Sequence, residues 1–223
     1  MTNPARQEIL ASLRRCSSKE VSPRPSVPVL RETALDREGM ISLFTEQLTL
    51  QTGEVHRVAD SESALDRLTE IAHSRGLTGV ITSTDDIIAS FDLSSWGILA
   101  GVTVRTARDF PDRTSWKQAV FEEADAGITG ADFAVAESGT VVLVHKDNQP
   151  RLVSLAPIFH IIILPVNRLV PTFEDAAKEL FVEGEAIPAQ VTFITGPSMT
   201  ADIQARPFKG MHGPRKVAVL LMG

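Results

Sequence analysis

Residues 160–165 read His-Ile-Ile-Ile-Leu-Pro, and the four residues from Ile161 to Leu164 are all apolar. A strand that is apolar at every position, without alternation, is typical of a sheet that helices bury on both faces. On either side of this stretch, segments with the helical repeat of 3.6 residues alternate with short strand-like segments. The pattern predicts a layered α/β fold with a largely parallel sheet.

Helices are predicted where apolar residues recur at helical spacing. Asp60 or Ser61 caps one of these helices, and Gly76 ends it. Thr172 caps another, with Asp175 three residues later, as in a capping box. The remaining helices are expected at residues 4–15, around Met40, Leu43, Phe44 and Leu48, and over residues 114–124 with Trp116, Val120 and Phe121 buried.

Strands are predicted from short apolar runs between turn residues. Because no helix is expected between Asp132 and Leu155, at least one antiparallel hairpin should lie in that part of the chain. The expected strands are residues 54–58, 78–82, 102–105, 133–136, 140–145, 152–155, 160–164, 191–195 and 216–222.

The beginning of the chain differs from the rest in composition. Residues 4–15 predict a short helix, and residues 16–28, Cys-Ser-Ser-Lys-Glu-Val-Ser-Pro-Arg-Pro-Ser-Val-Pro, are rich in Ser and Pro. Pro fixes φ and donates no backbone hydrogen bond, which is typical of a linker. We therefore expect a helical arm and linker over residues 1–33 and an α/β domain over residues 34–223.

Composition excludes several classes of protein. The 223 residues carry a formal net charge of −6, whereas neutralising nucleic-acid phosphates needs an excess of Lys and Arg, so no nucleic-acid partner is expected. No apolar run approaches the ~18 residues of a membrane span, and no signal peptide is predicted. Cys16 is the only cysteine, so we expect no disulfide and no iron–sulfur cluster held wholly by this chain. The expected compartment is the reducing cytoplasm.

Residues 127–140, Gly-Ile-Thr-Gly-Ala-Asp-Phe-Ala-Val-Ala-Glu-Ser-Gly-Thr, contain the first candidate site. In an extended strand Asp132 and Glu137 point to opposite faces, so they do not form a carboxylate pair. A two-residue turn at Ser138-Gly139 would place Glu137 opposite Thr140 at a sheet end, where open α/β sheets bind ligands. The alternative is that Glu137 is a solvated residue at the end of a strand.

Residues 195–202, Thr-Gly-Pro-Ser-Met-Thr-Ala-Asp, follow an apolar strand and form the second candidate site. They predict a strand-to-helix turn with Ser198 or Thr200 as the N-cap. Free N–H groups at a helix start favour a phosphate, carboxylate or sulfate, and Asp202 would hold the loop or the ligand. An ordinary capped turn is the alternative. The segment lacks the Gly-Lys-Ser/Thr ending of a Walker A loop.

Residues 210–214, Gly-Met-His-Gly-Pro, precede the last strand and form the third candidate site. His titrates near neutral pH, so His212 is a candidate acid, base or anion contact. His160 is interpreted as a buried, hydrogen-bonded core residue. No ligand spacing supports a metal site built from these two histidines and the two carboxylates, so neither metal nor cofactor is predicted. The other histidines, interpreted as surface residues, are His56, His73 and His145.

Together the three stretches resemble the LUD-domain family, and specifically its lactate-utilization protein C branch. Arg151, the Ser-Leu-Ala-Pro of residues 154–157 and His160 match the family at further positions. The resemblance covers roughly residues 34–223 and implies a three-layer α/β/α sandwich, similar to the NagB/RpiA/CoA transferase-like superfamily. Gln204 departs from the family, which often has Glu there, and puts any metal or general-base role at that position in doubt.

The family acts in bacteria beside a Cys-rich protein and an iron–sulfur protein in oxidising L-lactate to pyruvate. The resemblance therefore implies an accessory component of L-lactate utilization that works with iron–sulfur and Cys-rich partner subunits and binds a small anionic metabolite. Glu137 and His212 are the candidate catalytic residues. The candidate substrate-binding residues are Asp132, Arg151, His160, Thr195, Gly196, Ser198, Thr200 and Asp202.

Two alternatives stay open. One is a non-catalytic assembly factor for the iron–sulfur partners, using the N-terminal arm and the acidic residues between 122 and 137. The other is a freestanding enzyme that resembles a CoA transferase or a folate cyclo-ligase. In CoA transferases a strand-end Glu attacks an acyl thioester, and Glu137 is similar in position by analogy of fold alone.

Overall fold

The computed structural model describes residues 4–16, 35–182, 184, 186–201, 207–209 and 212–223. The chain divides into two units, residues 1–32 and residues 33–223. Among the residues just given, no helix is both long enough and apolar enough to cross a membrane.

Helix α1 (Pro4–Cys16) is the described part of the first unit. Its apolar side chains Ile9, Leu10 and Leu13 are exposed. The Ser/Pro-rich linker expected after it falls on residues 17–34, outside the described residues.

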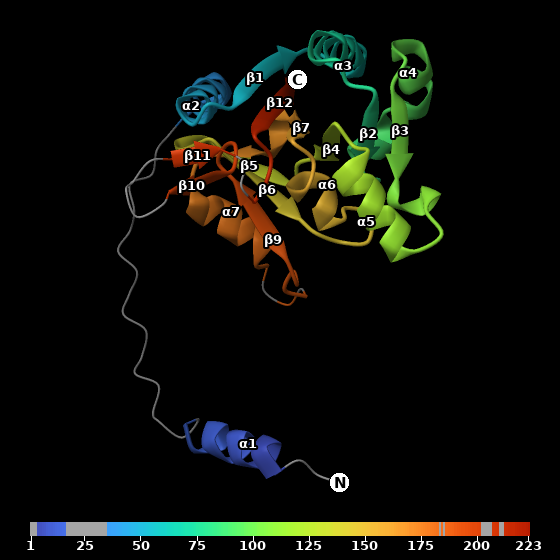
Figure 1. The fold of residues 1–223 in the computed structure, drawn as a ribbon. Helices are drawn as coiled ribbons and strands as arrows, with labels where there is room; N and C mark the ends of the chain where they lie inside the picture. The colour runs from blue at the N-terminus through green and yellow to red at the C-terminus, as the bar shows by residue number, and fades with distance from the viewer. Residues whose placement is uncertain (1–3, 17–34, 183, 185, 202–206, 210–211) are drawn as a thin grey trace. The chain divides into compact units, whose positions relative to one another are not determined.

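The second unit is built on a sheet of six parallel strands (Figure 1). These strands are β1 (Glu54–Val58), β2 (Gly79–Thr82), β3 (Thr103–Thr106), β4 (Ala126–Gly130), β7 (Phe159–Pro165) and β12 (Lys216–Met222). Their order is β1-β12-β7-β4-β2-β3, and every neighbouring pair is parallel. The apolar strand β7 lies inside this sheet with each residue from Ile161 to Leu164 at most 1% exposed, which confirms the predicted parallel sheet.

A second sheet has four strands, β5 (Phe133–Val135), β6 (Thr140–Val144), β8 (Leu169–Val170) and β9 (Val191–Ile194), in the order β8-β5-β6-β9. β5 and β6 are antiparallel, which confirms the hairpin expected in this region. Ala134, Val141 and Leu143 of this sheet pack in one core with Ile162 and Leu164 of β7. The second sheet therefore lies on one face of the main sheet.

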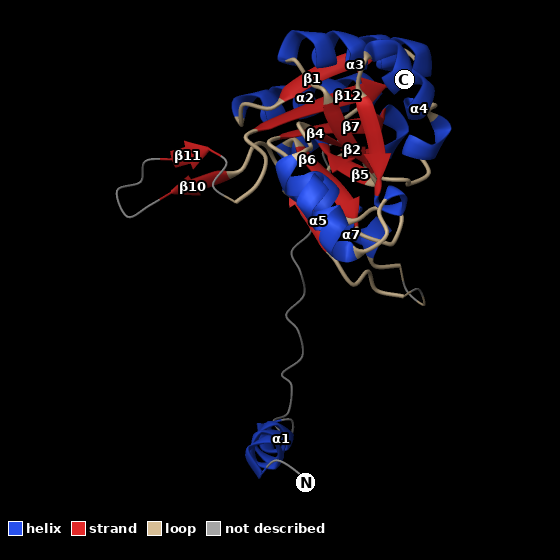
Figure 2. Cartoon of the chain, turned by 45° about the vertical axis from the view of Figure 1, so that its right-hand side comes forward, coloured by secondary structure: helices blue, strands red, loops and turns tan. Residues whose placement is uncertain are grey.

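Helices cover both faces of the main sheet (Figure 2). They are α2 (Arg37–Leu50), α3 (Ser61–Arg75), α4 (Leu93–Ala100), α5 (Arg113–Glu122), α6 (Arg151–Leu155) and α7 (Phe173–Leu180). α3 and α4 pack on one face. On the other face, α2 and the second sheet cover β7 and β12, while α5 and α6 cover β2 and β4. α7 packs on the outer side of the second sheet. The arrangement is an α/β/α sandwich with a small sheet in one outer layer.

The residues that were predicted to cap helices lie at the helix ends. The Asp60 side chain accepts the N–H of Ser63 at 2.9 Å as the N-cap of α3, and Gly76 ends that helix with φ of 62°. Thr172 is the N-cap of α7, and its hydroxyl accepts the N–H of Asp175. These contacts confirm the capping predictions.

Residues 152–155 lie in helix α6, so the strand predicted there is wrong. The reason lies in the neighbouring strand β4, where a Cβ at Gly127 would come within 1.8 Å of the Val153 carbonyl oxygen. Glycine therefore lets the backbone of α6 sit directly on the sheet. β4 is absent from the predicted strands because Gly at two of its five positions weakens the strand signal. The predicted burial of Phe121 is also wrong, since that residue is 63% exposed.

Candidate functional site

Glu137 lies in a turn and not opposite Thr140. Strand β5 ends at Val135, which pairs with Thr140, and a 3-10 turn over Ala136–Ser138 follows it. Gly139 then closes the turn with φ of 64°, a left-handed conformation that favours glycine. The connection is therefore four residues long, and the predicted two-residue turn is wrong.

The carboxylate of Glu137 is used to anchor a helix. Its Oε1 accepts the N–H of Phe173 at 2.8 Å, and its own N–H donates to the Pro171 carbonyl at 3.1 Å. Phe173 is the first residue of α7, and an anion near a helix start is favoured by the free N–H groups there. This contact ties the exposed turn to α7.

The segment after β9 does not start a helix. Residues 199–201 form strand β10 (Met199–Ala201), which pairs antiparallel with β11 (Pro207–Lys209), Thr200 lying opposite Phe208. The predicted strand-to-helix turn is therefore wrong, because the backbone groups pair across a hairpin. An anion site made by a helix start at Ser198 or Thr200 has no structural basis. The predicted residue Asp202 lies outside the described residues.

Parts of the three sequence motifs meet in space. The hydroxyls of Thr140 and Thr195 are 3.0 Å apart. The N–H of Ser198 donates to the Pro214 carbonyl at 2.8 Å, which joins the second motif to the third. His212 lies in the same loop as Pro214 and is exposed.

This motif cluster lies near the amino ends of the main-sheet strands. Pro214 stands two residues before β12, and the N–H of Arg215 donates to the Ile158 carbonyl just before β7. Gly139 and Gly196 pack against residues 47–51, which precede β1. Open α/β sheets bind ligands at the opposite edge, outside the carboxyl ends of the strands.

His160 is a core residue of β7. It is fully buried, and its Nε2 lies 2.9 Å from the hydroxyl of Thr129 on β4. Its Nδ1 has no hydrogen-bond partner among the described residues. Burial lowers the pKa of His160 to about 3, and the nearby His145 adds to this effect. The ring is therefore neutral at pH 7, in agreement with its interpretation as a hydrogen-bonded core histidine.

His145 is half-buried, so its interpretation as a surface residue is wrong. Its Nε2 lies 2.7 Å from the Thr192 hydroxyl, and its Nδ1 lies 3.1 Å from the Gln149 carbonyl. Burial lowers the pKa of His145, the hydrogen bond to Gln149 opposes this, and the charge of Arg151 lowers the pKa further. Arg151, a predicted substrate-binding residue, is the first residue of α6 and lines a cavity together with His145.

The carboxyl ends of the main strands form a second region with polar side chains. After β2 the chain continues outward to β3, whereas after β4 it continues in the opposite direction to β7 and β12. The gap between the ends of β2 and β4 is therefore the point where strand order reverses, which is the usual ligand position in such sheets. We call this region the switch point.

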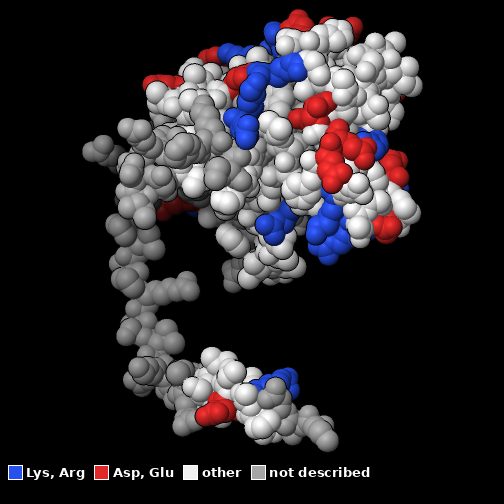
Figure 3. Space-filling model, in the orientation of Figure 1, with Lys and Arg blue, Asp and Glu red and all other residues white. Residues whose placement is uncertain are grey.

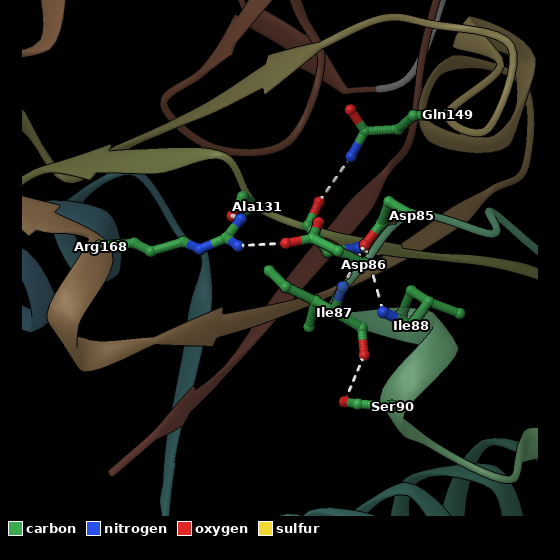
Figure 4. A network of polar contacts seen from close by, with 9 residues as sticks. Asp85, Asp86, Ile87, Ile88, Ser90, Ala131, Gln149 and Arg168 are labelled. Carbon is green, nitrogen blue, oxygen red and sulfur yellow. Dashed lines mark hydrogen bonds and ion pairs between the residues drawn. The ribbon is translucent and has the colours of Figure 1, made fainter. Parts of the chain in front are cut away.

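Asp85 connects the strand ends at the switch point through hydrogen bonds. Its carboxylate is buried and accepts the N–H groups of Ile87, Ile88 and Gly130 at 3.0–3.1 Å (Figure 4). A Cβ at Gly130 would lie 2.3 Å from Asp85 Oδ1, so the contact requires glycine. The bonds join the end of β2 to the end of β4.

Arg168 connects the segments that follow three strands, β7, β4 and β2. It follows β7, donates from Nη1 to the Ala131 carbonyl at 3.0 Å, and pairs through Nη2 with Asp86 (Figure 4). Gln149 adds a fourth connection, because its Nε2 donates to the Gly130 carbonyl at 2.8 Å. Contacts within the chain thus hold the side chains of Asp85 and Arg168 at the switch point.

Asp132 lines an open pocket at this edge, which we call the switch-point pocket. Its Oδ2 accepts the Val144 N–H at 2.7 Å, and its other oxygen makes no hydrogen bond within the described part of the chain. Burial raises the pKa of Asp132, while the hydrogen bond from Val144 and then the charges of Lys146 and Arg168 oppose this rise. The pocket has a volume of about 600 Å³ and is lined by Asp86, Asp132, Phe133, Lys146, Asn148, Asn167, Arg168, Val170 and Glu179.

Asp132 is thus the predicted substrate-binding residue that lies at the switch-point pocket, whereas Arg151 lines the neighbouring cavity. Lys146 lines both. The sequence reasoning missed Asp85, Lys146 and Arg168. A signal existed for two of them, since Asp85 and Arg168 each stand three residues after an apolar strand.

Among the described ranges, no group of three His, Cys, Asp or Glu side chains could hold a metal ion.

Comparisons with known proteins identify the chain's relatives. The sequence profile of the LUD domain matches residues 41–222. Lactate utilization protein C of Halalkalibacterium halodurans is 34% identical over 89% of this chain and 85% of that protein, and its counterpart in Shouchella clausii is 33% identical over 89% and 84%. A crystal structure of a DUF162 family protein from Deinococcus radiodurans has the same fold, with a TM-score of 0.57 and 22% identity over 85% of this chain and 99% of that chain. The chain therefore belongs to the LUD-domain family, in its lactate utilization protein C branch.

Proposed function

We propose that this chain is a component of L-lactate utilization that binds a small 2-hydroxy acid in the switch-point pocket. The relatives named lactate utilization protein C support the role in lactate utilization. The arrangement of charge around Asp132 supports the ligand class. The proposal replaces the anion site expected at residues 195–202.

A 2-hydroxy acid carries a carboxylate and a hydroxyl on adjacent carbons. The carboxylate needs a cation, and Lys146, which lines the same pocket as Asp132, is the candidate, because Arg168 is already paired with Asp86. The hydroxyl needs an acceptor, and the unengaged oxygen of Asp132 supplies one. The side-chain amides of Asn148 and Asn167 add neutral donors. The single observation that carries the proposal is this half-buried carboxylate, with one oxygen that makes no hydrogen bond among the described residues, close to the charge of Lys146.

Oxidation of the ligand requires an electron acceptor. With one cysteine, this chain cannot ligate an iron–sulfur cluster wholly by itself, and we assign electron transfer to iron–sulfur and Cys-rich partner proteins. In this proposal the chain binds and orients the 2-hydroxy acid. Asp132 is the group placed to accept a hydrogen bond from its hydroxyl.

Growth on L-lactate tests the function. In a bacterium whose own copy of this chain has been deleted, the wild-type chain should restore growth on L-lactate as sole carbon source. The Asp132→Asn and Lys146→Gln variants should not restore it, and circular dichroism of the purified variants should show that both fold. Arg57→Gln, which removes an exposed cation paired with Glu38, is the matched control and should restore growth. Full growth with Asp132→Asn and Lys146→Gln would contradict a role for this pocket.

A second candidate function is assembly of the iron–sulfur partners through α1. The exposed side chains of Ile9 and Leu13, each 61% exposed, give this helix an apolar edge suited to a partner protein. Of the acidic residues between 122 and 137 that this function would also use, Asp125 accepts the N–H of Thr78 and Glu137 accepts the N–H of Phe173. Loss of complex formation on deletion of residues 1–28, together with growth of the Asp132→Asn variant, would favour this function.

A further inference from the structure

A second cavity adjoins the switch-point pocket and has a different chemical character. It has a volume of about 650 Å³ and lies where α5, α6 and the loop of residues 145–150 meet. We call it the basic cavity, because its charged lining consists of Arg113, Lys117, Lys146 and Arg151 against one acid, Asp147. Figure 3 shows Lys and Arg side chains gathered on this face, over α5 and beside it.

The four cations of the basic cavity form no ion pair with an acid among the described residues. The ion pairs among the described residues involve other cations, such as Arg57, Arg75 and Arg105. The chain as a whole carries a net charge of −6, so four cations around one opening are a local concentration of positive charge. Their mutual repulsion is relieved when an anion binds between them.

Backbone hydrogen bonds hold the loop that carries Lys146. The Asn148 carbonyl accepts the N–H of Thr84 at 2.7 Å, and the Lys146 carbonyl accepts the N–H of Gln149 at 3.0 Å. Gln149 is itself buried against the end of β4. These bonds fix the backbone at residue 146, so binding a ligand there does not have to order the loop itself.

The backbone of α5 does not supply the anion contact. Its N-cap, Asp112, accepts the N–H groups of Thr114 and Ser115 at 2.8 and 2.9 Å. An anion in the cavity must therefore be bound by the side chains. Arg113 and Lys117 stand four residues apart on α5, so both lie on the same side of that helix.

The size of the cavity and its apolar wall indicate an organic ligand. Trp116, Leu152 and Leu155 line it beside the cations. Its volume of about 650 Å³ lies within the range of about 300–1,000 Å³ that is typical of pockets for organic ligands. Four cations match the multiple charges of a pyrophosphate group better than the single charge of a carboxylate.

We propose that the basic cavity binds an organic diphosphate, with the phosphates between Arg113, Lys117, Lys146 and Arg151 and the organic part against Trp116. This site is separate from the switch-point pocket and does not rest on the proposed function. Lys146 is the one cation that lines both.

Calorimetric titration of the full chain with ADP and with inorganic pyrophosphate tests the proposal. We expect both to bind, ADP about threefold or more tighter because the apolar wall contacts its organic part. Affinity should fall as salt is raised. The double variant Arg113→Gln/Lys117→Gln should weaken ADP binding about tenfold or more. Both of these residues line the basic cavity and not the switch-point pocket, so binding of L-lactate should not change in this variant.

The matched control is Arg57→Gln/Arg67→Gln, which removes the same charge from β1 and α3. It should leave ADP affinity within about twofold of the wild type. Absence of heat with both compounds at millimolar concentration would overturn the proposal. So would equal losses of affinity in the two double variants, or equal affinity of the wild type for ADP and pyrophosphate.

Discussion

The carboxylate of Asp85 accepts the N–H of Gly130 at 3.0 Å and so joins the end of β2 to the end of β4. These two strands are neighbours in the sheet, although 43 residues separate the end of one from the start of the other in sequence. The switch-point pocket is built on this contact. The order of the strands in the sheet, and not a single sequence motif, brings the polar groups of this pocket together.

Removing the Asp85 carboxylate should destabilise the fold. In the Asp85→Ala variant three buried N–H groups lose their acceptor, so we expect the free energy of unfolding to fall by about 2–4 kcal/mol. Urea unfolding followed by circular dichroism measures the loss. Asp86→Ala, at the exposed neighbouring carboxylate, should cost less than about 1 kcal/mol. Equal losses in the two variants would contradict the role assigned to Asp85.

The packing of α6 on β4 should not tolerate a side chain at Gly127. The Gly127→Ala variant places a methyl group within 1.8 Å of the Val153 carbonyl, and backbone cannot yield as a flexible side chain does. We expect a loss of about 1–3 kcal/mol or more in the free energy of unfolding. A thermal melt would show a lowered Tm. An unchanged Tm would mean that α6 does not lie directly on the sheet.

Burial of His160 should make stability depend on pH. In the folded chain its pKa is about 3, whereas in an unfolded chain it is near 6.5. Between these values the unfolded state binds a proton that the folded state does not. The free energy of unfolding should therefore fall as pH drops below about 6.5, by up to about 1.4 kcal/mol per pH unit from this group.

The His160→Gln variant checks this dependence. It should show a shallower loss of stability between pH 6.5 and pH 4 in urea titrations, because Gln does not titrate. His73→Gln, at an exposed position on α3, should keep the slope of the wild type. A wild-type slope in His160→Gln would show that other groups cause the acid sensitivity.

Two substitutions at Glu137 distinguish an anchoring role of this residue from a catalytic role. Glu137→Ala should lower the free energy of unfolding by about 1 kcal/mol, because the N–H of Phe173 loses its acceptor. Glu137→Gln keeps an oxygen there and should retain both stability and growth on L-lactate. Loss of growth with unchanged stability in Glu137→Gln would instead support the catalytic role expected from the sequence.

Local signals predicted much of the fold. The apolar run of β7 identifies the sheet interior, because alternate side chains enter two cores on opposite faces. The caps Asp60 and Thr172 locate the starts of α3 and α7, since each side chain accepts an N–H group only three residues away. Such features depend on neighbouring residues and can be read from a short window.

The pocket could be predicted only in part. Asp132 is among the candidate residues, but its neighbours Lys146 and Arg168 follow two other strands, β6 and β7, and the order of the strands brings them to the same pocket. The sequence does not predict strand β4, because glycines weaken a strand pattern. The same two glycines leave room for the backbone of α6 at Gly127 and for the Asp85 carboxylate at Gly130. The hairpin at Thr200 was mistaken for a helix start because a polar turn precedes both structures.

Calorimetric titration with L-lactate and with propionate, which lacks the hydroxyl, tests the central claim most directly. A site that hydrogen-bonds the hydroxyl through Asp132 should favour L-lactate by about tenfold or more. In Asp132→Asn this preference should shrink to about threefold or less, while Glu137→Gln should keep it. Equal affinity of the wild-type chain for the two acids, or no heat with either, would contradict a 2-hydroxy acid site at the switch point.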